Sequence, residues 1–280
     1  MQLPIQSQST YYVEPWEATA GAAELAAIAQ AADEIGFDYV AVCDHVQIPP
    51  DRAEAMSTTW YDTVATLGWL AGITTHVRLL SHVYVVAYRH PLLTAKAFAT
   101  LDHLSGGRAI LGVGAGHVEG EFDALGVPFH ERGRLTDAAL DGIRAAFDAA
   151  DQHPLGDPPI WVGGSSPAAI RRAAERGDGW LPQGTTKKEM PDAIARVHEL
   201  RTAAGRGERP FMIGAIAPTL FVGEPTWDLG PATLAGSPDK LRHVLGSYGE
   251  MGVDILQVRL RSRSADEYVD QLHAFHSEVM

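Results

Sequence analysis

Helix and strand signals follow one another closely within residues 90–133, and this succession constrains the fold more than any other part of the chain. Pro91 suits the first turn of a helix, where its missing N–H costs little, and the turn Ser105–Gly107 ends that helix. Arg108–Val113 is a short apolar run, as expected for a strand that is buried on both faces. The glycines of 112–116 then allow either a tight turn or the close approach of a ligand to the backbone. The block therefore predicts one α/β repeat with a loop at the carboxyl end of its strand.

The same alternation of strand-like and helix-like segments continues to the end of the chain. Strands are expected at Leu3–Gln8, Asp38–Cys43, Val77–Val86, Arg108–Val113, Ile160–Val162, Gly179–Pro182, Phe211–Ala217 and Asp254–Leu260. Helices are expected at Ala22–Ile35, Thr59–Thr74 (with Ser57, Thr58 or Thr59 as its N-cap), Pro91–Ser105, Leu135–Ala149, 167–176, Lys187–Ala204, 238–251 and 265–280. The segment Pro218–Gly236 is rich in glycine and proline and is expected to be irregular.

About eight strands alternating with about eight helices in 280 residues are typical of a (β/α)8 TIM barrel. We expect this α/β fold to span residues 1–280 as a single domain. An open, doubly wound sheet is the alternative. The barrel is favoured because the strand count comes to eight and because glycine-rich or polar loops follow several strands, not only the first. In such a barrel the functional site lies at the carboxyl ends of the strands, so residues that follow strands are the candidates.

Composition narrows the classes of partner. The net charge of −13 argues against nucleic acid or an anionic membrane surface, since both attract basic proteins. Cys43 is the single cysteine, so an intrachain disulfide is impossible, and this suits a reducing cytoplasm. The N-terminal segment lacks the pattern of a signal peptide, and no stretch approaches the roughly 20 apolar residues of a membrane helix. We expect a cytoplasmic protein that acts on a small molecule.

The pair Asp44-His45 follows the second expected strand and is the sharpest candidate for chemistry. A histidine can give or take a proton near neutral pH, and an adjacent polar group can fix its orientation. A histidine that only bonds to backbone at a strand end is the alternative. His82 and His117 would point into the same barrel mouth, which superficially resembles a three-histidine metal site. No H-x-H spacing and no carboxylate cluster accompany them, so we expect no metal.

Two later strands are followed by loops that suit phosphate. Gly163–Pro167 and Gly184–Thr186 each lead into a helix, whose free N–H groups and dipole attract an anion. Either loop could serve only as a helix cap, but two in succession favour phosphate. Trp60 and Tyr84 belong to a group of bulky residues that could wall a planar heterocycle or simply fill the core. A P-loop, a G-x-G-x-x-G motif and a nucleophile motif are missing, so the chain points to redox or binding chemistry carried by a cofactor.

Four segments, Ala31–His45, Val77–Gly133, Pro158–Pro182 and Ala235–Leu260, resemble the luciferase-like monooxygenase superfamily, and within it the oxidoreductases that use the deazaflavin coenzyme F420. The block SGGR-x-x-LGVGAG followed by EF-x-ALGV is specific to the superfamily. The resemblance implies a bacterial-luciferase-like barrel that binds a flavin or deazaflavin ring at the carboxyl ends of its strands. It also implies a homodimer.

The resemblance implies roles for individual positions. His45 is the expected catalytic proton donor, with His117 as the second choice, and the substrate is expected to lie under Trp60 and Tyr84. A bulge at Ser81-His82-Val83, often a non-proline cis peptide, is expected to support the ring from behind. The expected cofactor-binding residues, phosphate site included, are Asp44, Ser81, His82, Val83, Ala115, Gly116, His117, Gly163, Gly164, Gly184 and Thr185.

These roles together imply a coenzyme F420-dependent oxidoreductase that transfers a hydride between the deazaflavin ring and a small organic substrate, in either direction. An FMN-dependent monooxygenase that uses O2 is the first alternative, with FMN in place of F420. A non-catalytic protein that binds a flavin or deazaflavin is the second alternative.

Overall fold

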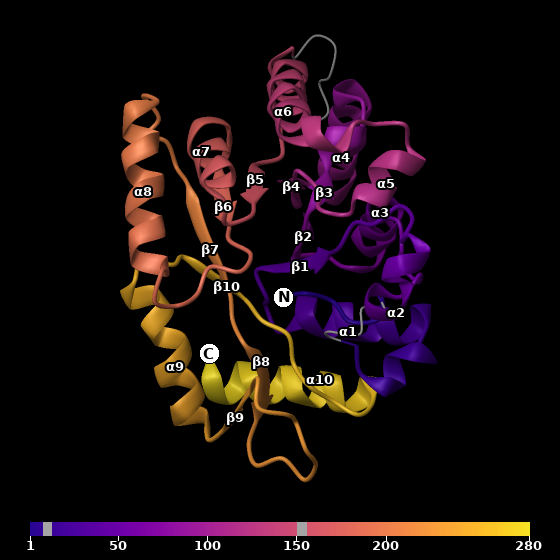
Figure 1. Cartoon of the computed structure of the whole chain (residues 1–280). Coiled ribbons are helices and arrows are strands. Elements are labelled where there is room, and N and C mark those ends of the chain that lie inside the picture. Colours follow the sequence, from indigo (N-terminus) through magenta and orange to yellow (C-terminus); the bar gives the residue numbers. More distant parts are fainter. Residues whose placement is uncertain (8–12, 150–155) are drawn as a thin grey trace.

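A curled, all-parallel sheet forms the centre of the molecule (Figure 1). The computed structural model describes residues 1–7, 13–149 and 156–280. Neighbouring strands of the sheet follow the order β1 (Tyr39–Val42), β2 (Arg78–Ser81), β4 (Ala109–Gly114), β5 (Ile160–Gly163), β6 (Gly179–Leu181), β7 (Met212–Ile216) and β10 (Ile255–Gln257). Each strand in this order lies beside the strand of the sheet that follows it in the chain. This is the arrangement of a barrel wall, and it excludes a doubly wound sheet, in which the strand order reverses.

The first residues of the chain lie between the two outer strands of this sheet. Gln2 forms a parallel bridge with Ala41 of β1, and its backbone N–H donates to the Val258 carbonyl just after β10 at 3.1 Å. The expected strand Leu3–Gln8 was wrong as a regular strand, because only isolated bridges occur, at Gln2 and Ser7. Ile5 has φ of +70°, which turns the chain out of an extended path. Gln8 lies outside the described residues.

Helices cover the outside of the curled sheet (Figure 1). The long helices are α1 (Ala22–Glu34), α3 (Thr63–Ile73), α4 (Pro91–Ser105), α6 (Arg132–Asp148), α7 (Pro167–Arg176), α8 (Met190–Ala203), α9 (Pro238–Glu250) and α10 (Ala265–Ala274), and all eight match expected helices. The short helices α2 (Ala53–Met56) and α5 (Glu119–Ala124) lie in loops that follow strands. Asp62 caps α3 by accepting from the Ala65 N–H at 2.8 Å, so the N-cap expected at Ser57–Thr59 was wrong. Among the described residues, no helix is both long and apolar enough to cross a membrane.

The expected strand Val77–Val86 is broken in two. β2 ends at Ser81, a cis peptide joins His82 to Val83, and β3 (Tyr84–Val85) resumes the pairing with β4. Leu80 pairs with Ile110 and Tyr84 with Val113, so four steps on one strand oppose three on the other. This extra residue is a bulge at the place that the resemblance implied.

The segment Pro218–Gly236 contains regular structure, so the expectation of an irregular loop was wrong. β8 (Thr219–Val222) and β9 (Thr233–Gly236) form a separate parallel pair, with Thr219 opposite Thr233. Figure 1 shows this pair beside α10, away from the central sheet. The glycines and prolines that suggested a loop lie mostly between the two strands, whereas Leu220, Phe221 and Val222 are buried.

Two apolar cores lie on the two faces of the sheet. The outer core lies between the sheet and the helices and is the larger. The inner core consists of Tyr39, Ala41, Leu80, Ile110, Trp161 and Leu181, with Met212 and Ile255 packed against it. These eight residues come from seven strands that adjoin one another, as expected for side chains that fill the inside of a curled sheet.

Candidate functional site

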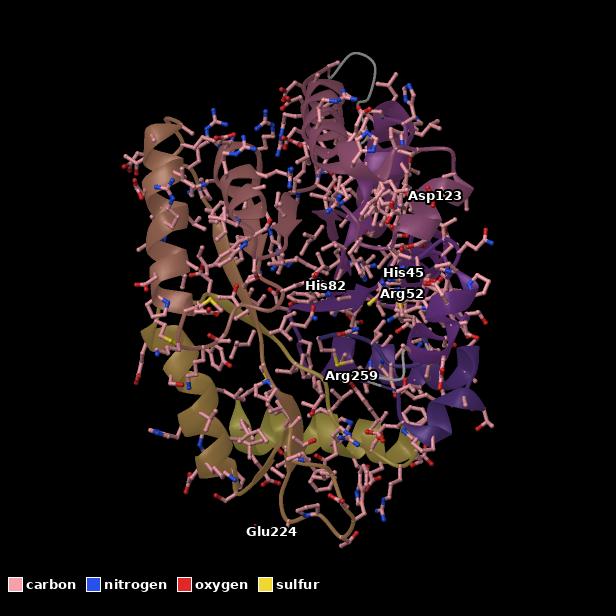
Figure 2. The ribbon with its side chains drawn as sticks, viewed as in Figure 1. His45, Arg52, His82, Asp123, Glu224 and Arg259 are labelled. Carbon is pink, nitrogen blue, oxygen red and sulfur yellow. The ribbon has the colours of Figure 1, made fainter. Side chains whose placement is uncertain are left out.

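The candidate site lies one level above the inner core, toward the carboxyl ends of the strands. Its residues are found by moving two positions along each strand from the last inner-core residue of that strand. Successive side chains of a strand alternate between its faces, so this step stays on the inner face. It reaches Cys43, His82, Gly112, Gly163, Gln183, Gly214 and Gln257, which we call the mouth layer. Large apolar side chains thus give way to polar residues and glycines at one level. Figure 2 shows His82 near the centre of the strands.

His82 is buried and neutral within the mouth layer. Burial, followed by the positive charge of the chain's amino terminus, lowers the pKa of His82 to about 4. The Gln257 Nε2 lies 3.3 Å from His82 Nδ1, and the Gln183 Nε2 lies 3.5 Å from His82 Nε2. Tyr39 donates from its hydroxyl to Gln257 Oε1 at 3.5 Å. His82 therefore contributes polarity, not charge, to the mouth at neutral pH.

The glycines around the bulge make room for Val83. A Cβ atom on Gly114 would lie 2.4 Å from Val83 Cγ2, and one on Gly163 would lie 2.6 Å from Val83 Cγ1. Ser81 is also engaged within the sheet, since its Oγ donates to the Gly112 carbonyl at 2.9 Å and accepts from the Gly112 N–H at 3.0 Å. Packing alone thus explains these residue types, and the cofactor contacts expected of Ser81, Val83 and Gly163 stay predictions.

Asp44 is buried and fully engaged with the protein. Arg89 donates to both of its carboxylate oxygens, at 2.6 and 2.9 Å. The Val85 N–H and the Thr63 hydroxyl donate as well, at 2.8 and 3.1 Å. Tyr84 is buried in the outer core, between the Arg89 guanidinium and the ring of Phe98. The cofactor contact of Asp44 and the substrate contact of Tyr84 stay predictions, because both side chains contact protein here.

His45 lies at the centre of a compact cluster with Trp60, His117 and Glu121. Its Nδ1 lies 2.8 Å from Glu121 Oε2, and the two side chains are 11% and 3% exposed. The ring centroids of Trp60 and His117 lie 4.3 and 5.7 Å from that of His45. The structure therefore brings together the expected catalytic residue, one expected substrate residue and one expected cofactor residue.

Glu121 was not recognised in the sequence. Its second oxygen, Oε1, accepts from the backbone N–H groups of Val46 at 2.6 Å and Gln47 at 3.2 Å. Burial raises the pKa of this carboxyl, but the bonds from His45 and the two backbone groups outweigh it and hold the pKa below its ordinary value. The signal was present, because Glu121 is an acidic residue beside the apolar Phe122 within the EF-x-ALGV segment.

The two loops expected to bind phosphate lie against each other. Ser165 donates from its hydroxyl to the Gln183 carbonyl at 2.7 Å, and Thr185 donates to the Ser165 Oγ at 2.6 Å. Gly164 and Gly184 have φ of +106° and +86°, which favours glycine at both positions. Phosphate binding at Gly163, Gly164, Gly184 and Thr185 stays a prediction. Ala115 and Gly116 follow β4 at the same end of the sheet, and their ring contacts also stay predictions.

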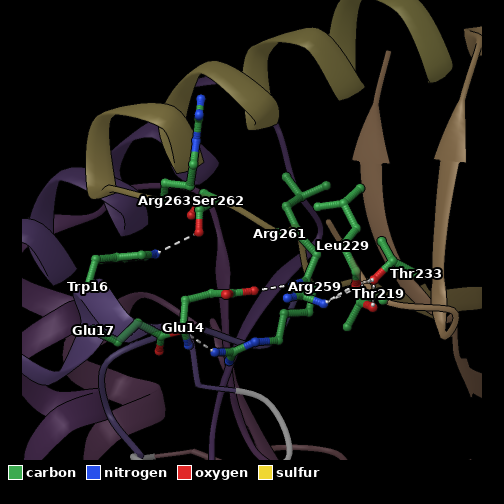
Figure 3. Close-up of polar contacts among 12 residues, drawn as sticks. Glu14, Trp16, Glu17, Thr219, Leu229, Thr233, Arg259, Arg261, Ser262 and Arg263 are labelled. Atoms are coloured by element: carbon green, nitrogen blue, oxygen red, sulfur yellow. Dashed lines mark hydrogen bonds and ion pairs between the residues drawn. The ribbon is translucent and has the colours of Figure 1, made fainter. Parts of the chain in front are cut away.

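Two arginines that follow β10 are ion-paired (Figure 3). Arg259 donates to Glu17 at 2.7 Å, and both side chains are buried. Arg261 pairs with Glu14 and donates to the Leu229 carbonyl at 2.7 Å. These contacts join the segment before α1 to the strand end after β10. Within the described ranges, no group of three or more His, Cys, Asp or Glu side chains could hold a metal ion.

A comparison with known families decides the class of the chain. The family model for luciferase-like monooxygenases matches residues 3–226. The chain belongs to this family. It is therefore an oxidoreductase, and the non-catalytic alternative is set aside.

Two sequence relatives and two solved structures are similar to this chain. An uncharacterized protein of Mycobacterium tuberculosis is 31% identical over 68% of this chain and 75% of its own length. A 5,10-methylenetetrahydromethanopterin reductase of Methanopyrus kandleri is 26% identical over 65% of this chain and 58% of its own length. An F420-dependent secondary alcohol dehydrogenase shares the fold with a TM-score of 0.76 and 16% identity, over 92% of this chain and 95% of its own. The monooxygenase RslO1 of Streptomyces bottropensis has a TM-score of 0.79 and 20% identity, over 99% of this chain and 98% of its own.

Proposed function

We propose that this oxidoreductase transfers a hydride between coenzyme F420 and a small organic substrate, and that His45 moves the accompanying proton. The main support is the His45 cluster at the carboxyl ends of the strands, where a family member binds its redox ring. A structural neighbour described as an F420-dependent secondary alcohol dehydrogenase agrees with this choice of cofactor.

The mouth layer suits a planar, partly polar ring. His82, Gln183 and Gln257 offer hydrogen-bonding groups, while the glycines of the layer project no side chain into the mouth. Ile216 lies two residues beyond Gly214 on the same face of β7 and is 42% exposed, although it is large and apolar. An exposed apolar side chain next to the polar side chains of the mouth layer suits a flat heterocycle, which has apolar faces and polar edges. When bound, the deazaflavin ring supplies or accepts the hydride at its C5 atom.

His45 is the group best placed to move a proton. It is an imidazole in a largely buried cluster, with one ring nitrogen held by Glu121. A positioned general acid or base contributes about 10²–10⁴-fold to a rate. We expect His45→Asn to lower turnover by about that factor while the affinity for the cofactor stays within a few-fold.

An anaerobic assay tests this function. Oxidation of reduced F420 is followed by absorbance, with electron-poor alkenes, imines and ketones as candidate acceptors. We expect F420 oxidation under nitrogen with at least one acceptor class, and about 10²–10⁴-fold slower oxidation by His45→Asn. Equal rates for His45→Asn and the wild-type protein would remove His45 from the proposal.

An FMN-dependent monooxygenase is the second candidate, since one structural neighbour is described as a monooxygenase. Reduced FMN and an oxygen electrode distinguish the two. Substrate-dependent O2 consumption with FMN, together with no F420 oxidation under nitrogen, would favour the monooxygenase.

Three further proposals concern the molecule that carries this site. We propose that the segment 1–3 completes a full (β/α)8 barrel, since its backbone forms hydrogen bonds to both β1 and the strand end after β10.

We also propose that the protein is a homodimer, on the family resemblance. The single cysteine supports a location in the reducing cytoplasm. Sedimentation of the purified chain tests the dimer, and a monomer at micromolar concentration would contradict it.

A further inference from the structure

We propose that Glu121 is a positioning residue that keeps a proton on His45 Nδ1, so that His45 exchanges protons with the substrate through Nε2 alone. The catalytic consequence rests on the proposed function. The position of the proton on His45 is independent of the proposed function, because it depends only on contacts within the chain.

The contact between the two side chains determines the donor. An ionised carboxylate has only acceptor oxygens, so a nitrogen that bonds to it must carry the hydrogen. Glu121 Oε2 lies 2.8 Å from His45 Nδ1, and Glu121 is 3% exposed. The carboxylate is held in its charged form, since its bonds keep its pKa below the ordinary value. His45 Nδ1 therefore donates in both the neutral and the protonated ring.

The other oxygen of Glu121 prevents the carboxylate from turning away. Oε1 accepts from the Val46 N–H and the Gln47 N–H, which directly follow His45 in the chain. One carboxylate thus holds both the imidazole and the backbone of its loop. A glutamine could accept with only one atom, so either the His45 Nδ1–H or the two backbone donors would lose their partner.

The remaining ring nitrogen is the one available for exchange. Among the described residues, nothing forms a hydrogen bond to His45 Nε2, and the rings of Trp60 and His117 make T-shaped contacts with the His45 ring. Desolvation, followed by the nearby His45, lowers the pKa of His117. His117 is therefore mainly uncharged at neutral pH.

The proton balance of the reducing direction follows from this arrangement. Bound reduced F420 would supply a hydride, which carries the electron pair, to one atom of a polarised double bond in the substrate. The other atom of that bond takes the proton from protonated His45 Nε2. The Nε2–H bond breaks, its electron pair stays on Nε2, and the Nδ1–H stays with Glu121. Solvent then returns a proton to Nε2, in balance with the proton that reduced F420 would release to solvent on oxidation.

The proton on His45 can be located by NMR on the full chain without cofactor. Histidines labelled with 15N give two-bond 1H–15N spectra that identify which ring nitrogen carries hydrogen, and the His45 signals are those lost in His45→Asn. At a pH where His45 is neutral, we expect the Nδ1–H form in the wild-type protein. We expect Glu121→Gln to shift the population toward Nε2–H. Asp123→Asn, an exposed position on the same short helix, is the matched control and should leave the spectrum unchanged.

Two results would overturn the positioning role. One is an Nε2–H form in the wild-type protein, and the other is an unchanged form in Glu121→Gln. If Glu121→Gln does not fold, a slowly exchanging, strongly downfield Nδ1–H proton signal in the wild-type protein supports the proposal, and its absence overturns it.

Kinetics separates the positioning role from the proposed function. With reduced F420 and a substrate that turns over, we expect Glu121→Gln to lower kcat by about 10–100-fold, with KM and the cofactor Kd within a few-fold. An unchanged kcat would overturn the positioning role in catalysis. If the NMR result holds but neither F420 nor FMN binds, the position of the proton stands and the proposed function fails.

Discussion

Packing against neighbouring side chains can explain which residue types occupy the mouth layer, without any contact to a ligand. Gly163 shows this most clearly, because it was expected to bind phosphate, and yet the side chain of Val83 fills the space that a Cβ would need. Such a residue can still contact a ligand through its backbone. Its side-chain identity, however, is determined by the bulge.

Gly163→Ala tests this packing explanation. The added methyl group would lie 2.6 Å from Val83 Cγ1, and overpacking of this kind costs about 1–3 kcal/mol. The control is Gly72→Ala in α3, where nothing lies within 4 Å and helix propensity should add about 0.5–1 kcal/mol of stability. Urea unfolding measures both. Equal effects of the two substitutions would contradict the packing explanation.

Asp44→Asn tests whether Asp44 mainly supports the scaffold. The substitution leaves the half-buried Arg89 guanidinium, which is 16% exposed, without its counter-ion; breaking a fully buried pair costs about 3–5 kcal/mol, so we expect a loss toward the lower end of this range. Asp51→Asn is the control, since Asp51 is 77% exposed and its pair with Arg52 should contribute within about 0.5 kcal/mol. A stable Asp44→Asn protein that has lost only cofactor affinity would instead make Asp44 a ligand contact.

His82 should make the stability of the protein depend on acid pH. Its folded-state pKa is lowered to about 4, so the unfolded chain binds more protons between pH 6.5 and about 4. The free energy of unfolding must therefore fall as pH falls through this window, by roughly 3 kcal/mol from this residue. Urea unfolding at pH 7, 5.5 and 4.5 should show a shallower loss for His82→Gln than for the wild-type protein. Parallel curves would show that His82 is not held neutral.

At the scale of elements, the start of α3 is set by a single side chain. Asp62 caps α3, although Ser57, Thr58 and Thr59 directly precede the first apolar residues of the expected helix. Asp62→Ala should cost about 1 kcal/mol, and Thr58→Ala should change stability by less than about 0.5 kcal/mol. Thermal unfolding of both variants measures the difference. A larger loss of stability for Thr58→Ala than for Asp62→Ala would support the N-cap that was expected at Ser57–Thr59.

Strong local patterns made most elements predictable. Pro91 and Gly106 determined the ends of α4, and Ser166 and Ser237 determined the starts of α7 and α9, because caps and breakers act within one turn. Predictions failed where tertiary contacts override composition. The apolar run Val77–Val86 predicted one unbroken strand, and only the family resemblance implied its bulge, whereas the glycines and prolines of 218–236 hid β8 and β9.

The candidate site could be predicted only in part. The pair Asp44-His45 was visible because it directly follows a buried strand. Glu121 was not, because its role depends on a contact across 76 residues of sequence. Gln257 was missed for the same reason, since its partner His82 lies 175 residues away. A step of two residues from each inner apolar position would have found Gln257, once the strand ends were known.

At the scale of the whole molecule, the curled sheet explains how distant segments make one site. Cys43 and Gln257 lie near opposite ends of the chain and still belong to one mouth layer, because parallel strands bring all their carboxyl ends to one side. The family match over residues 3–226 covers β1 to β8 and leaves β10 outside. Gln257 thus joins the mouth from a part of the chain that lies beyond the matched segment.

Cofactor choice is the central claim, and a titration of the cofactor-free protein tests it most directly. F420 and FMN are titrated in parallel and followed by the quenching of their fluorescence. We expect saturable F420 binding with a Kd at least about tenfold lower than that of FMN, which corresponds to about 1.4 kcal/mol in binding free energy. Tighter binding of FMN would contradict the F420 assignment and favour the monooxygenase, and binding of neither would contradict the ring site itself.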